Sequence, residues 1–155
     1  MGVKKAKFVA DLKKFARVGL DSSIVIYHLE DVEPYSDLTE AIFTAMARRS
    51  LTAILSTISV TELLVKPFAE RQSDRVAQFE TFIHSLPNAV LVPPDYAIAK
   101  EAARLRGEHG LRTPDALLLA TALVEKAEAF LTNDRRLQKL KIPGLGVVML
   151  SDYVS

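Results

Sequence analysis

Four acidic residues of this 155-residue chain are placed where their carboxylates can act together. They are Asp21, Glu62, Asp115 and Asp134. Carboxylates that converge repel one another, and a divalent cation supplies the positive charge that relieves this repulsion. The chain has no cysteine, and its three histidines are scattered, so the ligands would be oxygen atoms only. Oxygen ligands favour Mg²⁺ or Mn²⁺ over zinc. The pattern therefore indicates a hard-metal site.

A Mg²⁺ ion that carboxylates hold, and that keeps several of its waters, suits reactions at phosphate. Asp21 and Asp134 are the strongest candidates for direct ligands. Glu62 and Asp115 would bind the metal directly, bind it through water, or orient the attacking water. Three neighbours, Ser22, Thr132 and Asn133, are candidates for accessory positions that tune ligand geometry, with ordinary capping and turn bonding as the alternative.

Each acidic residue also has an ordinary structural explanation. Asp21 is suited to cap a following helix, and Glu62 fits a capping box that starts at Ser59. Asp115 follows Thr113-Pro114 in the expected first turn of a helix, where the helix dipole favours negative charge. Asp134 fits an Asn-Asp turn. Each explanation serves one residue, whereas a metal site accounts for the placement of all four together.

The segments between these residues predict an α/β protein. Short apolar runs read as strands and alternate with segments of helical period, whereas Ser22–Leu29 fits either a strand or a helix. A helix that starts near Val60 is expected to break near Pro67. Such alternation predicts a three-layer α/β/α sandwich with a central, mostly parallel sheet. The expected strands are Val18–Leu20, Thr52–Thr57, Ala89–Val92, Ala129–Thr132 and Gly146–Leu150, and the other expected helices are Asp37–Arg49, Ser73–Leu86, Asp95–Glu108 and Thr113–Lys126.

Composition indicates one globular domain over residues 1–155. Apolar residues make up 49% and charged residues 25%, and no apolar run is long enough for a membrane span. The lack of cysteine fits a cytoplasmic protein. The net charge is only +1, but basic residues crowd the N-terminal extension 1–16 and follow Asp134. Each basic cluster is either a solvated face or a phosphate contact.

Four segments of the chain resemble the four motifs of PIN domains, and most closely those of the VapC-like toxins of toxin–antitoxin pairs. The likeness covers about Arg17 to Leu150. The segments are LDSSIVIYHL at Leu20–Leu29, SVTELL at Ser59–Leu64, TPDALLLATAL at Thr113–Leu123 and FLTND at Phe130–Asp134.

This resemblance implies a PIN-like fold and a Mg²⁺- or Mn²⁺-dependent endoribonuclease that hydrolyses RNA phosphodiester bonds. Asp21, Glu62, Asp115 and Asp134 match the family's acidic residues, with Thr132 or Ser22 as an accessory position. The resemblance also implies a homodimer and a cognate antitoxin protein that covers the site.

Two departures from the family pattern concern the extension and the residue Leu137. The basic segment before Arg17 precedes the usual start, and it is an added helix, an RNA arm or a disordered lead. Leu137 stands where the family often has an aromatic residue. Two alternatives to the toxin stay open: a PIN-like module that binds RNA or protein without cutting, and a housekeeping RNA-processing nuclease.

Overall fold

The computed structural model describes residues 2–155 and has a five-stranded parallel sheet at its centre. The strand order is β3-β2-β1-β4-β5, with every neighbouring pair parallel. The predicted α/β/α fold with a mostly parallel sheet is therefore confirmed. The strands are β1 (Arg17–Leu20), β2 (Thr52–Ser56), β3 (Ala89–Val92), β4 (Ala129–Thr132) and β5 (Gly146–Met149).

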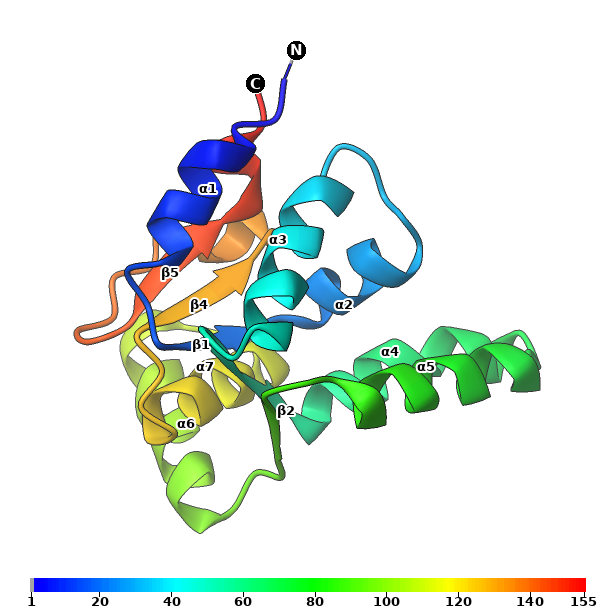
Figure 1. Cartoon of the computed structure of the whole chain (residues 1–155). Helices are drawn as coiled ribbons and strands as arrows, with labels where there is room; N and C mark the ends of the chain where they lie inside the picture. The colour runs from blue at the N-terminus through cyan, green and yellow to red at the C-terminus, as the bar shows by residue number, and fades with distance from the viewer. Residues whose placement is uncertain (1) are drawn as a thin grey trace.

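Helices cover both faces of this sheet (Figure 1). α1, α2 and α3 pack on one face, and α6 and α7 on the other. α4 and α5 lie side by side and project from the body as a hairpin (Figure 1). The helices are α1 (Lys5–Leu12), α2 (Ser22–Leu29), α3 (Ser36–Ala47), α4 (Thr57–Ala69), α5 (Ser73–Ser85), α6 (Tyr96–His109) and α7 (Thr113–Val124), with 3₁₀ turns η1 (Arg135–Leu137) and η2 (Leu150–Tyr153).

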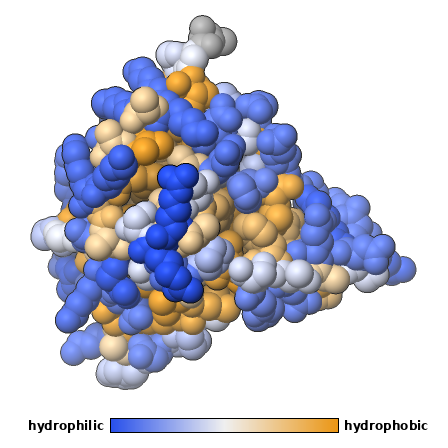
Figure 2. Space-filling model, viewed as in Figure 1, coloured by the Kyte–Doolittle hydropathy of each residue, from blue (hydrophilic) through white to orange (hydrophobic). Residues whose placement is uncertain are grey.

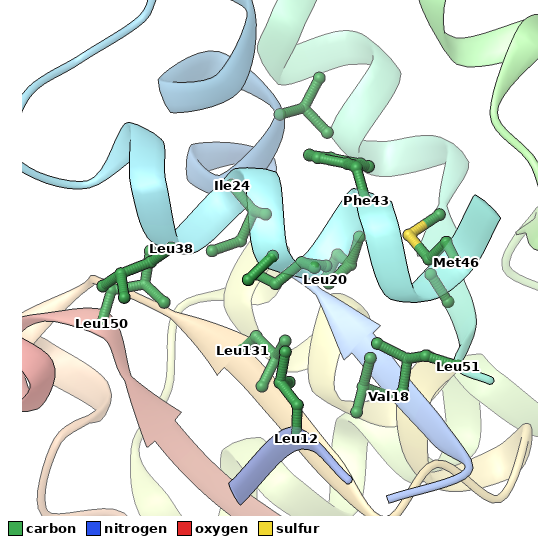
Figure 3. Packing of buried hydrophobic residues seen from close by; sticks show 14 of the residues in the cluster. Leu12, Val18, Leu20, Ile24, Leu38, Phe43, Met46, Leu51, Leu131 and Leu150 are labelled. Atoms are coloured by element: carbon green, nitrogen blue, oxygen red, sulfur yellow. The ribbon is translucent and has the colours of Figure 1, made fainter. Parts of the chain in front are cut away.

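The molecule has two hydrophobic cores, one on each face of the sheet. Side chains alternate in direction along the strands and so contribute to both cores. Val18, Leu20 and Leu131 point to the α1–α3 face, whereas Ile54 and Phe130 point to the α6–α7 face. Figure 3 shows the first core, in which strand side chains meet residues of α2 and α3 such as Ile24, Leu38 and Met46. Both faces of the inner strands β1, β2 and β4 are buried, as expected for a parallel sheet, whereas Val90 and Leu91 of the edge strand β3 are exposed.

The segment Ser22–Leu29, which fitted either a strand or a helix, is the helix α2. Asp21 caps it, because its carboxylate accepts a hydrogen bond from the Ser22 backbone N–H at 2.8 Å. Apolar Ile24 and Val25 are fully buried against the sheet and α3. The N-cap that Asp21 provides and the burial of Ile24 and Val25 together favour a helix over a strand for this segment.

α4 continues through Pro67, where a break was predicted, and ends at Ala69. Pro67 is buried within the helix, and its carbonyl accepts a hydrogen bond from the Gln72 N–H at 2.8 Å in the turn to α5. The helix also begins earlier than predicted, at Thr57, with Ser56 as its cap. Ser59 is therefore not a capping residue, and the capping box that was the ordinary alternative explanation for Glu62 does not form.

The basic N-terminal extension forms an added helix, α1, that packs against α3 and η2. Phe8 is completely buried and meets the Tyr153 ring edge-on at a centroid distance of 4.8 Å. Within residues 2–155, no helix is long and apolar enough to cross a membrane.

Candidate active site

The strand order reverses beside β1, which places two of the predicted acidic residues at one point of the sheet edge. β1 lies between β2 and β4, so the chain leaves β1 toward one side and later returns to the other. Parallel α/β sheets bind ligands at such switch points, beyond the carboxyl ends of the strands. Asp21 directly follows β1, and Asp134 lies just beyond β4.

Asp21 is held by three hydrogen-bond donors at the end of β1. Its carboxylate Oδ1 accepts from the Ser22 N–H at 2.8 Å and from the Ser22 hydroxyl at 3.3 Å. Its Oδ2 accepts from the Thr132 hydroxyl at 2.5 Å. Thr132 is fully buried, and its hydroxyl also accepts from the Asp134 N–H at 3.0 Å. Thr132 therefore ties Asp21 of β1 to the start of the Asp134 turn.

Burial raises the pKa of Asp21 above its ordinary value, and the negative charge of Asp134 raises it further. The hydrogen bonds from Thr132 and Ser22 act in the opposite direction, because they stabilise the charged form. Asp21 is only 8% exposed, so its charge is held in a poorly solvated place. A raised carboxyl pKa in such a setting is typical of functional sites and also occurs in structural networks.

Glu62 reaches this group from α4 through Ser22. The Ser22 hydroxyl lies 3.2 Å from Glu62 Oε1, so its single proton is shared between Asp21 and Glu62. Burial raises the pKa of Glu62, and the negative charges of Asp21 and Asp115 add to that effect. Glu62 lies beyond the first turn of α4, so the end of the helix does not explain its position.

Asp115 and Asp134 are paired with arginines. Asp115 is buried in the first turn of α7, and its Oδ2 accepts from Arg112 Nε at 3.0 Å. Asp134 accepts from the backbone N–H of Arg136 at 3.0 Å and from its guanidinium, with Nη2 at 2.5 Å from Oδ2. These bonds from Arg136 lower the pKa of Asp134. Arg136 also lies 3.8 Å from Asp115.

The three candidate accessory residues divide into two groups. Ser22 and Thr132 hydrogen-bond directly to the predicted acidic residues. Asn133 has a different role, because its side chain donates to the Tyr27 hydroxyl at 3.2 Å and accepts from the Ser151 N–H at 2.9 Å. Asn133 therefore links α2, the end of β4 and η2 through long-range hydrogen bonds, and it makes neither a turn bond nor a contact with the carboxylates in these interactions.

The carboxylates are near one another but do not form a ready metal cage. Within residues 2–155, no group of three or more His, Cys, Asp or Glu side chains is placed to hold a metal ion. The donor set, carboxylates with hydroxyls beside them, still fits a hard divalent cation in type. Arginine side chains occupy part of the space between these carboxylates, because Arg136 contacts both Asp115 and Asp134.

Two features of this region were missed by sequence reasoning. One is Arg136, which was grouped with other basic residues rather than paired with Asp134; the two-residue spacing within a turn is the signal that pointed to it. The other is a groove of about 670 Å³ between α2 and the α4–α5 hairpin, which includes Glu62 in its lining. The sequence carries no signal for the groove, since it depends on how the hairpin projects.

The fold and the position of these residues define a class: a parallel α/β protein with acidic residues at the switch point of its sheet. The family model for the PIN domain matches residues 18–143. The chain therefore belongs to the PIN domain family, as its motifs predicted. α1 lies outside the matched residues.

Solved structures share this fold at low sequence identity. A chain of VapBC2 from Rickettsia felis, bound to a promoter DNA fragment, has a TM-score of 0.64 and 18% identity, with 84% of this chain and 96% of that one covered. A toxin–antitoxin complex from Klebsiella pneumoniae gives 0.58 and 24%, covering 83% and 94%. FitAcB from Neisseria gonorrhoeae gives 0.61 and 17%, covering 86% and 98%. No curated protein matches the chain.

Proposed function

We propose that this protein is a Mg²⁺- or Mn²⁺-dependent endoribonuclease and the toxin of a toxin–antitoxin pair, acting in the cytoplasm. The observation that carries the proposal is the link between Asp21 and Glu62 through the Ser22 hydroxyl, at the switch point of the sheet. Two carboxylates with raised pKa values share one proton donor there, beside Asp134 and Asp115. Membership of the PIN domain family supports the same reading.

The residues have distinct roles in this proposal. Asp21 and Asp134 would hold the metal, and Glu62 and Asp115 would bind it through water or orient the attacking water. When bound, the metal would lower the pKa of a water and offset negative charge at the phosphate. Thr132 and Ser22 fix the orientation of the Asp21 carboxylate through their hydroxyls. The guanidinium of Arg112 supplies positive charge for an RNA phosphate.

The groove between α2 and the α4–α5 hairpin is the proposed path of the RNA strand. Glu62 lies in its lining with acidic Glu30, Glu70 and Asp74. The lining also has basic Lys66 and Arg71, and Arg75, which is paired with Glu30 at 2.7 Å. Phosphates of a bound strand would meet these basic side chains while one phosphodiester lies beside Glu62 and Asp21. The groove therefore connects Glu62 to the basic side chains of Lys66 and Arg71 within a lining of mixed charge.

The proposed partners are a cognate antitoxin protein and a second copy of the chain. Similar chains occur in a toxin–antitoxin complex from Klebsiella pneumoniae and in a VapBC toxin–antitoxin system from Mycobacterium tuberculosis, which supports an antitoxin partner here. An apolar stripe on α4 supports self-association, since Val65 and Phe68 are more than 60% exposed. Exposed apolar side chains gathered on one helix face are typical of a protein interface.

A cleavage assay tests the enzymatic proposal. Purified protein should cut single-stranded RNA in Mg²⁺ or Mn²⁺ and lose the activity in EDTA. Asp21→Asn should reduce cleavage by about 100-fold or more while the circular dichroism spectrum stays unchanged, because the charged ligand is lost and the helix cap is kept. Asp37→Asn, at an exposed position at the start of α3, is the matched control and should cleave like the wild type.

A contaminating nuclease would cleave equally in the wild-type and Asp21→Asn preparations, and that result would reject this site.

Expression of the wild type should arrest growth, and Asp21→Asn should relieve the arrest. A housekeeping nuclease would cleave RNA without causing arrest. A short reading frame just upstream that encodes a DNA-binding antitoxin would favour the toxin.

One observation favours the non-catalytic alternative, a PIN-like module that binds RNA or protein. The acidic side chains within residues 2–155 are not grouped as a metal cage, and arginines pair with two of them. On this alternative the wild type and Asp21→Asn would both bind RNA and neither would cleave it. Gel-shift and cleavage assays on the same preparations separate the two functions.

A further inference from the structure

Arg136 brings a positive charge from the chain itself to two of the acidic residues, Asp134 and Asp115. Its Nε is 3.0 and 3.1 Å from the two carboxylate oxygens of Asp134, and its Nη2 is 2.5 Å from Oδ2. The same guanidinium reaches Asp115, with 3.8 Å between Nη1 and Oδ2. Arg136 is thus the side chain that joins these two acidic residues.

These contacts use the oxygen atoms that a divalent cation would need. Mg²⁺ binds carboxylate oxygens at about 2.0–2.1 Å and in near-octahedral geometry. Both oxygens of Asp134 already face guanidinium N–H groups, and Asp115 faces guanidinium nitrogens of Arg112 and Arg136. A cation that takes these oxygens must replace the Arg136 contacts.

The surroundings of Arg136 allow it to leave. Its side chain is 54% exposed, whereas that of Asp134 is 22% exposed and that of Asp115 is 10% exposed. Water can solvate the released guanidinium, while the carboxylates that stay behind keep a need for positive charge. The arrangement therefore suits the exchange of one cation for another.

We propose that Arg136 is an exchangeable cation of the acidic site, which pairs with Asp134 and Asp115 in the metal-free protein and is displaced when a divalent metal binds. This inference rests on the proposed function, because it assumes that these carboxylates are metal ligands. Arg136 then acts as a positioning residue: it keeps the acidic residues in place without metal and sets the metal concentration at which the site fills.

The test is Mn²⁺ binding by isothermal titration calorimetry, without RNA. Arg136→Met keeps an extended side chain and removes the charge, so it should bind Mn²⁺ about threefold to tenfold more tightly than the wild type, because a competing ion pair is lost. Arg136→Lys, which keeps a charge but not the planar fork, should fall between the two. Arg135→Met, at the exposed neighbouring position, is the matched control and should bind like the wild type.

A second measurement reports the exchange directly. In a Mg²⁺ titration followed by ¹⁵N-arginine NMR, the Nε–H signal assigned through Arg136→Met should move to the position of a solvent-exposed arginine as the metal binds. In Asp134→Asn, where the closer charged partner is missing, the Arg136→Met substitution should change the Mn²⁺ affinity by less than it does in the wild-type background, because only the Asp115 contact remains. Both results would support displacement from Asp134.

The outcomes separate this inference from the proposed function. If the wild type binds Mn²⁺ and Arg136→Met binds it equally or more weakly, Arg136 does not compete and the inference is wrong, while the nuclease proposal stands. If only Arg136→Met binds Mn²⁺, Arg136 blocks the site permanently instead of exchanging with the metal, and the inference is wrong. If neither protein binds Mn²⁺, both the inference and the metal-dependent nuclease are wrong.

Discussion

At the scale of single residues, Asp21 has two opposing effects on the stability of the fold. As the cap of α2 it stabilises the fold, because it accepts the Ser22 N–H. As a charge that is 8% exposed it destabilises the fold, and this is the reason its pKa is raised. Asparagine keeps the capping oxygen and removes the charge, so the two roles are separable by one substitution.

We therefore predict that Asp21→Asn stabilises the metal-free protein near pH 7. Because the folded-state pKa of Asp21 is raised, the stability from its protonated form is complete below the ordinary value of 3.8 and is lost as the pH rises through the raised pKa. The melting temperature in EDTA should then be about 2–4 °C higher in the variant near pH 7, and the gap should close on acidification to about pH 3.

Thermal melts over that pH range, with Asp37→Asn as the exposed control, measure this gap. A gap that is constant with pH, or a variant that is less stable near pH 7, would mean that the hydrogen bonds of Asp21 outweigh the cost of burying its charge. Saturating Mn²⁺ should reverse the order, since only the wild type has the full set of charged ligands.

The sequence predicted the location of the acidic residues in the fold better than the side chains with which they pair. Asp21 and Asp134 follow strands, so their place at the sheet edge follows from the strand pattern alone. The pairing of Arg136 with Asp134 depends on the backbone path of a 3₁₀ turn, and periodicity does not determine that path. Ser59 matched a capping pattern, but the helix starts before it and leaves its hydroxyl buried without a hydrogen-bond partner.

At the scale of elements, the close packing of β1 against α7 determines where Asp21 lies. Gly19 is on β1, and a Cβ atom there would come within 2.8 Å of the Ala122 Cβ and 2.9 Å of the Phe130 ring. Ala122 belongs to α7, which also carries Asp115. The lack of a side chain at Gly19 therefore lets α7 lie close against β1, and it couples the positions of two predicted site residues.

We predict that Gly19→Ala destabilises the protein by about 1–3 kcal/mol, the cost of forcing extra volume into a packed core. Gly107→Ala is the matched control, because a Cβ there meets nothing within 4 Å and the residue lies inside α6. That substitution should stabilise by about 0.5–1 kcal/mol. Urea unfolding of both variants measures these changes, and equal effects would show that β1 and α7 adjust freely.

The helices that the sequence predicted most accurately are those with a clear apolar stripe and a clear stop. α6 was expected over Asp95–Glu108 and spans Tyr96–His109, ended by Gly110 in the left-handed region at φ 67°. α4 was less accurate, since the expected break at Pro67 assumed an isolated helix. Burial of Pro67 in the α4–α5 pair overrides that expectation, and sequence periodicity does not report this packing.

At the scale of the whole molecule, the basic N-terminal segment is part of the packed structure. α1 covers one face of the sheet with Phe8 and Leu12, while its lysines remain exposed. The amino groups of Lys7 and Lys14 lie 4.0 and 3.2 Å from carboxylate oxygens of Asp11, so part of the positive charge is paired within the N-terminal segment. Of the three forms considered for this segment, the added helix is the one that the structure has.

We predict that Phe8→Ala destabilises the protein by about 3–5 kcal/mol, the cost of a cavity at a fully buried aromatic residue. Tyr96→Ala, at a position that is 83% exposed, is the control and should change stability by no more than about 0.5 kcal/mol. Thermal and urea unfolding measure both. If Phe8→Ala were as mild as the control, α1 would be a loosely attached arm rather than part of the core.

The general architecture followed from the sequence, whereas the strand order and the outline of the molecule did not. Alternating strands and helices predicted the parallel α/β/α sandwich. That β1 lies between β2 and β4 depends on contacts far apart in the chain, such as Val18 with Ala53 and Ala129. The projecting hairpin, whose outer end is mostly hydrophilic in Figure 2, likewise depends on how α4 and α5 pair.

The two ends of the described chain are joined by hydrogen bonds, with 2.9 Å between the Gly2 nitrogen and the Ser155 hydroxyl, and by an antiparallel bridge between Val3 and Val154. Figure 1 shows both ends at the same pole, away from the α4–α5 hairpin. A short peptide linker could therefore close the chain into a ring without moving β1 or β5. New ends opened in a surface loop would give a circular permutant in which α1 is held by chain connectivity on both sides.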